Sequence, residues 1–251
     1  MNITTDLHVH TTFSDGLNTP EEVVLSAMNM GLRRLGFSDH SHTSFDETWC
    51  VHRSAIPLYR RTIHDLRKKY ADKIDILCGI EQDRYASEPP EGYDYAIGSV
   101  HYLKAGGEFL PVDESREVLE RGVQNYFGGD FASFAESYFE NVAYFADVPE
   151  VNIVGHFDLL TKFSECGELF DENAPRYVSS WRTAADRLID AGKTFEINTG
   201  AISRGYRTSP YPRKCIVDYI KIRGGRLILS SDCHRASDLC YQFERWEDWL
   251  K

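Results

Sequence analysis

Histidine and carboxylate residues recur two positions apart at several points along the sequence. The pairs are, in chain order, His8 and His10, His40 and His42, Glu81 and Asp83, His156 and Asp158, and Asp232 and His234. Because side chains alternate across a β-strand, residues i and i+2 project from the same face. Both members of a pair on a strand end can therefore reach one metal ion or two adjacent ions. Imidazole and carboxylate suit zinc, manganese or iron, and the absence of cysteine from the pattern disfavours a thiolate site.

The pairs fall where predicted strands end. The predicted strands span 3–9, 34–39, 74–82, 94–102, 151–157, 194–199 and 226–232. His101 lies at the end of the fourth strand, and Glu196 and Asn198 lie at the end of the sixth. One H-x-H alone is weak evidence, but seven of the nine histidines occupy such ends, which favours a metal centre over unrelated surface residues. We expect the other two, His52 and His64, to face solvent.

Predicted helices lie between most of these strands. Thr19-Pro20-Glu21-Glu22 supplies a helix N-cap, a proline at the first helical position and acids in the first turn. The predicted helices span 20–30, 54–71, 131–147, 173–191 and 210–223. Alternation of strands and helices predicts a parallel α/β sheet, either open and doubly wound or closed. Polar residues at so many strand ends favour a closed barrel with its chemistry on the C-terminal rim, in one domain over 1–251.

Composition limits the classes of function. The 251 residues are 42% hydrophobic, with a formal net charge of −11, which disfavours nucleic acid as a partner and still allows a small phosphorylated substrate. None of the six cysteines forms a C-x-x-C pair, and we expect reduced thiols. The sequence shows neither a signal peptide nor an apolar run long enough for a membrane span. We therefore expect a cytoplasmic protein without a membrane partner, and homo-oligomerisation is left open.

Seven short motifs carry a resemblance to a known family. They are HVHTTFSDG, SDHS, GIEQD, IGSVH, GHFD, NTGAISRGYR and SDCH. In this order, and over nearly the full length, they resemble the PHP (polymerase and histidinol phosphatase) superfamily, especially its monofunctional histidinol-phosphatase branch. The resemblance implies a distorted (β/α)7 barrel, similar to a TIM barrel, that holds two or three divalent metal ions (zinc, manganese or iron).

The resemblance also assigns metal ligands by position. It implies that one metal is held by His8, His10, Glu81 and Asp232. Glu81 would bridge to a second metal, which His101 and His156 complete, and a third metal would be held by Asp15, His40 and His234. Some members of the family carry histidine at the position of Asp15, so the identity and occupancy of the third metal stay open.

The implied reaction is hydrolysis of L-histidinol phosphate to L-histidinol and phosphate. A hydroxide that bridges the metals would attack phosphorus in line, since paired metals can stabilise both the attacking and the leaving oxygen. Arg204, Lys162 and Arg207 are the expected cations for the phosphate, with Arg204 favoured by the resemblance. His42 is a candidate general acid for the leaving group, and Asp158 competes for that role or orients a ligand histidine.

Recognition of the rest of the substrate is assigned only to loops. Segments 43–53 and 104–130 are long enough to overhang the rim, and their acids Asp46, Glu47, Asp113 and Glu114 could pair with an amine. Three alternatives stay open at this point. The chain could hydrolyse another small phosphate ester or a nucleotide, bind metal in a regulatory role without turnover, or act on an uncharged substrate as amidohydrolases do.

Overall fold

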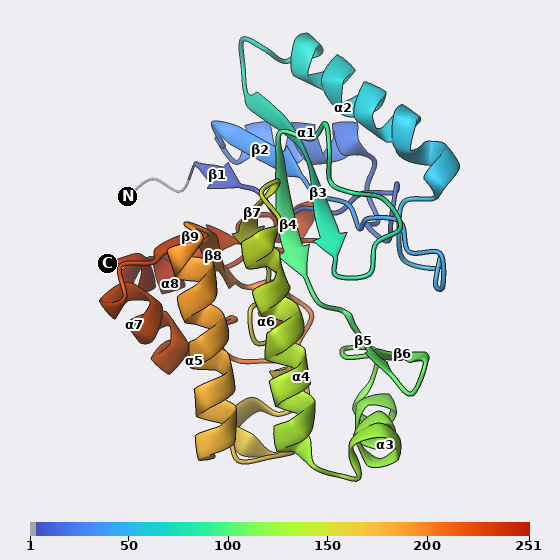
Figure 1. The fold of residues 1–251 in the computed structure, drawn as a ribbon. Helices are drawn as coiled ribbons and strands as arrows, with labels where there is room; N and C mark the ends of the chain where they lie inside the picture. Colours follow the sequence, from blue (N-terminus) through green and yellow to red (C-terminus); the bar gives the residue numbers. More distant parts are fainter. Residues whose placement is uncertain (1–3) are drawn as a thin grey trace.

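The computed structural model describes residues 4–251, apart from the side chain of Cys166, and has a seven-stranded parallel sheet at its centre (Figure 1). The strands are ordered β1-β2-β3-β4-β7-β8-β9. Their bounds are Thr5–Asp6, Arg34–Phe37, Asp75–Asp83, Tyr95–Ser99, Val151–Val154, Thr194–Asn198 and Arg226–Ser230. All seven predicted strands are therefore present, although residue 3 of the first lies outside the described residues.

The two outer strands of the sheet meet and close it into a barrel. β1 pairs with β2 only at Thr5 and Asp6, which is why it is shorter than predicted. The chain then moves across to the other edge, where Val9 forms a parallel bridge with Cys233 and His10 N donates to Cys233 O at 2.9 Å. Seven parallel strands in a nearly closed ring confirm the predicted distorted (β/α)7 barrel.

The inside of the barrel changes from apolar to charged along each strand. On β3 the inward positions are Leu77, Gly79, Glu81 and Asp83, so an apolar side chain precedes a glycine and two carboxylates. Tyr95 of β4 fills the space beside Gly79, where an added Cβ would lie 2.4 Å from the tyrosine ring. This closely packed apolar layer supports the polar side chains above it at the carboxyl ends of the strands.

Helices cover the outside of the barrel. The main ones are α1 (Pro20–Asn29), α2 (Ile56–Lys69), α4 (Phe131–Ala143), α5 (Pro175–Asp190) and α7 (Lys214–Ile222), with short helices α6 (Gly200–Ser203) and α8 (Phe243–Trp246). The predicted start of α1 is confirmed, because Thr19 and Glu22 form a reciprocal capping box. α4 and α5 lie side by side on the face away from α1 and α2 (Figure 1).

The segment 104–130 is more structured than the sequence predicted. It contains most of a hairpin, in which β5 (Tyr102–Ala105) pairs with β6 (Glu108–Pro111). The helix α3 (Arg116–Phe127) follows. The predicted fourth strand was too long for this reason: β4 ends at Ser99 and Tyr102 begins the hairpin. The rings of Phe109 and Phe45 stack at 3.7 Å, so the hairpin supports the loop 43–53 beside the rim.

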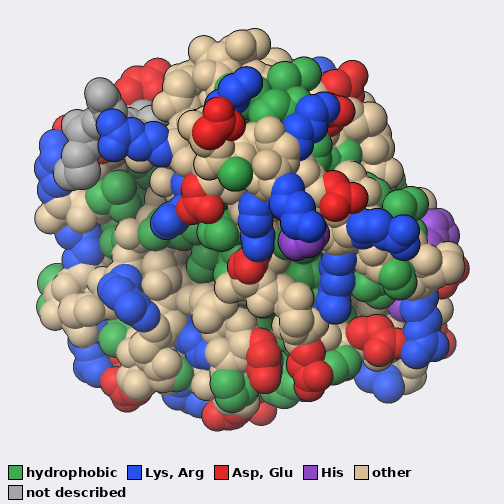
Figure 2. All heavy atoms as spheres, turned by 90° about the horizontal axis from the view of Figure 1, so that it is seen from above, with side chains coloured by type: hydrophobic (Ala, Val, Ile, Leu, Met, Phe, Trp, Pro, Cys, Tyr) green, Lys and Arg blue, Asp and Glu red, His purple; other side chains and the backbone are tan. Residues whose placement is uncertain are grey.

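The face of the molecule above α1 and α2 has mixed charge. Figure 2 shows basic and acidic side chains interspersed over it, with small hydrophobic areas between them. Within residues 4–251, no helix has the length and apolar character that a membrane crossing would require.

Candidate metal centre

All nine ligand positions that the sequence proposed lie together at the carboxyl end of the barrel. Their nitrogen and oxygen atoms form four overlapping groups, in each of which the atoms lie within 4.8 Å of one another. The groups are His8 with His10 and Asp232; His8 with Glu81 and His156; His40 with Glu81 and His101; and His10 with Asp15, His40 and His234. Four overlapping groups of this kind can accommodate more than one metal ion.

Glu81 occupies the centre of the cluster. Its Oε1 atom lies 3.0 Å from His156 Nε2, 3.4 Å from His8 Nε2 and 3.5 Å from His101 Nε2. Its Oε2 atom lies 2.8 Å from His40 Nδ1. A carboxylate that faces histidines on both oxygens has the geometry needed to bridge two metals. The grouping differs from the predicted one, because His40 approaches Glu81 together with His101, and His156 groups with His8 and Glu81.

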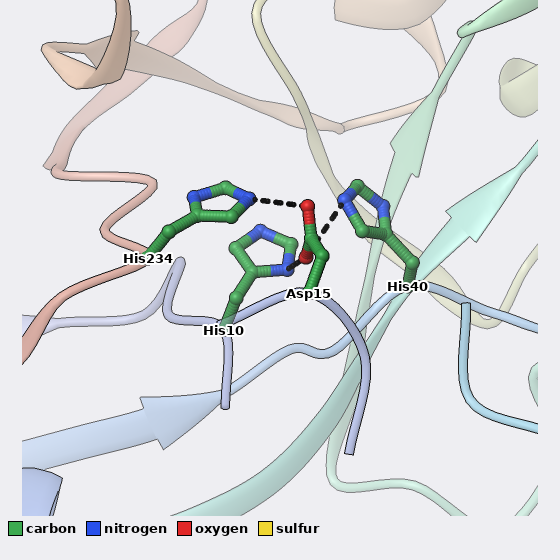
Figure 3. Close-up of side chains that lie close together, drawn as sticks. All are labelled: His10, Asp15, His40 and His234. Carbon is green, nitrogen blue, oxygen red and sulfur yellow. Dashed lines mark ion pairs between the residues drawn. The ribbon is translucent and has the colours of Figure 1, made fainter. Parts of the chain in front are cut away.

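Asp15 organises a second part of the cluster. Figure 3 shows its carboxylate between the rings of His10, His40 and His234. Asp15 Oδ2 lies 3.0 Å from His234 Nε2, and Asp15 Oδ1 lies 3.6 Å from His40 Nε2 and 3.7 Å from His10 Nδ1. The side chains predicted for the third site, Asp15, His40 and His234, thus lie close together, with His10 beside them.

Unsatisfied buried atoms fit the presence of metal ions. Among the described residues, His8 Nε2, both ring nitrogens of His10 and His156 Nδ1 are buried without a hydrogen-bond partner. Glu81 Oε2 lies close to His40 Nδ1 but without the geometry of a hydrogen bond. A buried polar atom without a partner is costly, and native proteins seldom leave several in one place. Three of these residues contribute to the groups around Glu81. The donor set, neutral imidazole with carboxylate, is one that divalent zinc, manganese or iron accepts.

Electrostatics in the cluster favours a bound cation. Burial tends to raise the pKa of the Glu81 carboxyl, yet the imidazoles of His40 and His8 hold it well below its ordinary value. Burial, with the neighbouring charges of His234 and His40, lowers the pKa of His10 to about 3, so this ring is in the neutral form that a metal requires. For His40, burial is outweighed by Glu81 and Asp15, which raise its pKa to about 10. The carboxylates therefore attract positive charge to this position.

A cavity of about 330 Å³ opens onto the cluster. Its wall includes metal-ligand candidates, Lys162 and Arg204, and the loop residues Asp46, Trp49, Asp113 and Glu114. Arg204 donates to Asp232 Oδ2 and to the Asp232 carbonyl at 2.9 and 2.8 Å. Lys162 Nζ donates to the carbonyl and carboxylate of Asp113 at 2.7 and 3.1 Å. Both cations therefore line the cavity close to the candidate ligands, where they could contact an anionic group bound in it.

Arg207 is not among the residues that line this cavity, and its predicted contact with phosphate gains no geometric support. The side chain is buried in the wall, where Nη1 donates to Thr161 O at 2.9 Å and to Thr161 Oγ1 at 2.7 Å. Nε donates to Ser209 O at 3.3 Å. The chain turns after α6, so residues three apart in sequence point in different directions. Arg207 holds two loops together.

The two candidate general acids also lie away from the cavity wall. His42 is buried against Cys50, 3.8 Å from Sγ, with Nε2 3.5 Å from Glu47. Asp158 is fully buried, and its Oδ2 accepts from Arg213 N at 3.0 Å. Neither side chain is among the cavity residues in this structure. In the described chain, the general-acid prediction for His42 and Asp158 therefore gains no geometric support.

Three carboxylates with no predicted role support the ligands. Asp39 accepts from Thr11 N and Ser14 Oγ at 2.8 and 2.7 Å and so fixes the loop before Asp15. Asp83 lies 3.3 Å from His101 Nδ1. Glu196 accepts from His8 Nδ1 at 2.9 Å. The i, i+2 spacing of Glu81 with Asp83 and of Glu196 with Asn198 was the available signal, but spacing cannot distinguish a ligand from a residue that holds one.

Comparison with known proteins identifies the family. The PHP domain matches residues 6–200, which include seven of the nine candidate ligands. The chain belongs to the PHP family. The "Probable histidinol-phosphatase" of Deinococcus radiodurans is 29% identical over 252 residues, covering 95% of this chain and 89% of that protein. The histidinol-phosphatase of Bacillus subtilis is 24% identical over 264 residues, covering 95% of this chain and 96% of that protein.

Solved structures of PHP proteins share the fold. A crystal structure from Listeria monocytogenes has a TM-score of 0.84 and 22% identity, covering 97% of this chain and all of that one (100%). The histidinol phosphate phosphatase of Lactococcus lactis, crystallised with zinc, L-histidinol and phosphate, has a TM-score of 0.73 and 20% identity, covering 98% of this chain and 92% of that one. At these identities the similarity supports the barrel itself.

Proposed function

We propose that this chain is a metal-dependent phosphomonoesterase that hydrolyses L-histidinol phosphate to L-histidinol and phosphate. The observation that carries the proposal is one cavity whose wall combines six of the nine candidate ligands with two cations, Arg204 and Lys162. Curated relatives that match 95% of this chain are named as histidinol-phosphatases, which selects this ester among possible phosphates. We further propose two or three bound divalent ions, with zinc as the first metal to test, in a cytoplasmic enzyme.

Different side chains of the site would bind the metal ions and the phosphate group. Metal ions, when bound, supply an activated water nucleophile and neutralise phosphate charge. Glu81 and the surrounding histidines would hold those ions. Arg204 directs its guanidinium between Asp232 and the cavity, where it can donate to phosphate oxygens as negative charge builds on them. Lys162 adds a second positive charge on the same wall.

The amine of the substrate needs a carboxylate that is not already engaged by another side chain. Among the four loop acids considered from sequence, Asp113 is paired with Lys162, and Asp46 accepts from Tyr102 Oη at 2.7 Å. Glu47 does not line the cavity. Glu114 lines it, is exposed, and has no polar partner among the residues that the structure describes. We therefore propose that Glu114 receives the ammonium group.

Flat side chains at the cavity mouth suit the imidazole of the substrate. Trp49 and Tyr206 both line the cavity, and each leaves about half of its surface exposed (55% and 49%). An aromatic ring can stack on either one, in the offset or edge-on geometries that aromatic pairs prefer. Binding energy from the amine and the imidazole would distinguish L-histidinol phosphate from esters that offer phosphate alone.

Steady-state kinetics tests the proposal. With the same zinc loading, kcat/KM for L-histidinol phosphate should exceed that for p-nitrophenyl phosphate by at least about a hundredfold, or roughly 2.7 kcal/mol. This should hold although p-nitrophenolate is the better leaving group. A panel with a nucleotide and a sugar phosphate tests the alternative substrate. If one of these is hydrolysed more efficiently, the proposed metal centre is retained and the proposed substrate is wrong. If no phosphate is released from any ester, the proposed phosphatase function is wrong.

A further inference from the structure

Glu196 is a fully buried carboxylate next to the candidate ligands, and both of its oxygens are engaged. It lies on β8 near the carboxyl end of the barrel. Its Oε2 atom lies 2.9 Å from His8 Nδ1 and accepts from Ser230 Oγ at 2.5 Å. Its Oε1 atom accepts from His156 N at 2.6 Å and from Asn198 Nδ2 at 2.7 Å. With four donors around two oxygens, Glu196 is placed to hold other groups rather than to bind a metal.

The contact with His8 determines which ring nitrogen is free. A carboxylate accepts hydrogen bonds, so Nδ1 of His8 carries a proton that it donates to Glu196. The other nitrogen, Nε2, is buried without a hydrogen-bond partner, 3.4 Å from Glu81 Oε1 and 3.7 Å from Asp232 Oδ1. The ring therefore presents Nε2 to the two carboxylates that are proposed to share its metal. Metal-bound histidines commonly have this arrangement, with the second nitrogen on a carboxylate.

A second contact of Glu196 holds the backbone of another ligand candidate, His156. His156 follows β7, and its backbone N–H donates to Glu196 Oε1. Its Nε2 atom lies 3.0 Å from Glu81 Oε1. One carboxylate on β8 is thereby bonded to ligand candidates that follow β1 and β7.

We propose that Glu196 is a positioning residue that keeps the proton of His8 on Nδ1 and thereby prepares Nε2 for the metal. The proposal rests on the metal-dependent function proposed above. Glu196 has no access to substrate, because it is fully buried and does not line the cavity. Its effect on catalysis passes through the bound metal.

The substitution Glu196→Gln tests this role because its amide can fit in only one orientation. The Oε1 position faces two donors of fixed orientation, the backbone N–H of His156 and the side-chain amide of Asn198. The Asn198 amide cannot turn, because its Oδ1 atom already accepts from Gly200 N. The carbonyl of the glutamine must therefore take the Oε1 place, and its NH2 group must face His8 Nδ1. His8 then has to accept at Nδ1 and carry its proton on Nε2, the nitrogen needed by the metal.

The experiment measures zinc affinity by competition with a chromophoric chelator. Glu196→Gln should weaken the binding of one zinc ion, the one proposed for His8, about ten- to a hundredfold, the usual effect of removing a carboxylate that supports a ligand histidine. Ser230→Ala is the matched control. It removes another hydrogen bond to the same Oε2 atom but leaves the proton of His8 in place, so it should keep wild-type affinity within about threefold. Circular dichroism checks that both variants are folded.

A measurement on the wild-type protein removes dependence on the variant. In ¹⁵N NMR of the zinc-loaded wild type, the His8 ring, identified by the loss of its signals in His8→Asn, should carry its proton on Nδ1. A proton on Nε2 would overturn the proposal, as would a folded Glu196→Gln variant with unchanged zinc affinity. If the wild type binds no zinc, the failure lies with the metal-dependent function itself. If zinc binds and L-histidinol phosphate is not hydrolysed, the named substrate is wrong and the positioning role remains under test.

Discussion

Arg204 Nη2 lies 2.9 Å from Oδ2 of Asp232, while Oδ1 of the same carboxylate lies 3.2 Å from Nε2 of His10. One carboxylate thus connects a cation on the cavity wall to a candidate metal ligand. Asp232 is held in a left-handed backbone conformation (φ 49°), which is unusual for a residue other than glycine. The guanidinium thus lies next to the metal cluster, where its Nη1 atom also lies 3.0 Å from His234 Nδ1, while His234 Nε2 faces Asp15.

Replacing Arg204 should therefore affect turnover more than metal binding. In Arg204→Met, we expect kcat/KM for L-histidinol phosphate to fall by the equivalent of about 2–4 kcal/mol, the scale of losing one preorganised charged donor. Zinc content should stay near the wild-type value, because Oδ1 of Asp232 keeps its position beside His10 and His8. Kinetics and elemental analysis of the same preparation measure both. An effect below about twofold would place Arg204 outside the phosphate site.

Replacing Arg207 should lower the stability of the fold and leave turnover almost unchanged. Its guanidinium is buried and donates to the carbonyl and hydroxyl of Thr161, which are left without that donor in Arg207→Met. We expect the free energy of unfolding to fall by about 2–3 kcal/mol, as for a lost hydrogen bond from a buried charged group. The folded fraction should keep kcat/KM within about twofold of the wild type. Urea denaturation and kinetics well below the transition separate the two effects, and a large loss of kcat/KM at unchanged stability would contradict the assignment.

These two arginines illustrate what the sequence could and could not predict. The alternation of strands and helices, and the polar residues at the strand ends, predicted a barrel with ligand-type side chains at one rim. These two features follow from local patterns, because parallel strands necessarily bring their carboxyl ends to one rim. The choice of nine candidate ligands among those polar residues, and the addition of Asp15, came from the resemblance to the PHP family. Arg204 and Arg207 follow the same strand, and only the path of the turn after α6 decides which one faces the cavity.

Other differences have the same origin. The segment 104–130 carries weak local signals, and its hairpin depends on contacts with the distant loop 43–53, such as Phe45 on Phe109. The contact of Glu196 with His8 joins residues 188 positions apart. No spacing rule in the sequence distinguishes that carboxylate from the ligands themselves.

The bridging role proposed for Glu81 is tested by Glu81→Gln. The substitution keeps the size of the side chain and removes the negative charge that faces five histidines. We expect loss of at least one zinc ion per chain and a fall in kcat/KM of more than about a hundredfold, since the effect combines metal loss with lost charge stabilisation. Elemental analysis gives the zinc content, and circular dichroism checks the fold. Wild-type zinc content with full activity would remove Glu81 from the centre.

Metal removal should lower stability. Without ions, several buried nitrogens and an oxygen of Glu81 lack hydrogen-bond partners, and the carboxylates lack their cations. Zinc that binds only the folded chain at a thousand times its dissociation constant stabilises by about 4 kcal/mol per site. We expect the Tm to fall after treatment with a chelator and to recover when zinc is added. The same titration on Glu81→Gln is the control and should give a smaller increase in Tm. Equal increases in both proteins would indicate zinc binding elsewhere.

The role proposed for Glu114 predicts a selective loss for substrates that carry an amine. In Glu114→Gln, kcat/KM for L-histidinol phosphate should fall about tenfold, or roughly 1.4 kcal/mol, because the ammonium loses a charged partner on the cavity wall. The deamino analogue, which keeps the phosphate and the imidazole, should react equally well with the wild type and the variant. Glu117→Gln is the matched control, since Glu117 is exposed in the first turn of α3 and does not line the cavity.

Raising the salt concentration should reduce the wild-type advantage for the amine, because the pair is partly exposed to solvent. If Glu114→Gln slows both substrates equally, Glu114 acts on the loop and not on the amine; if it slows neither, the ammonium group is bound by another residue, and Asp46 is the next carboxylate to replace.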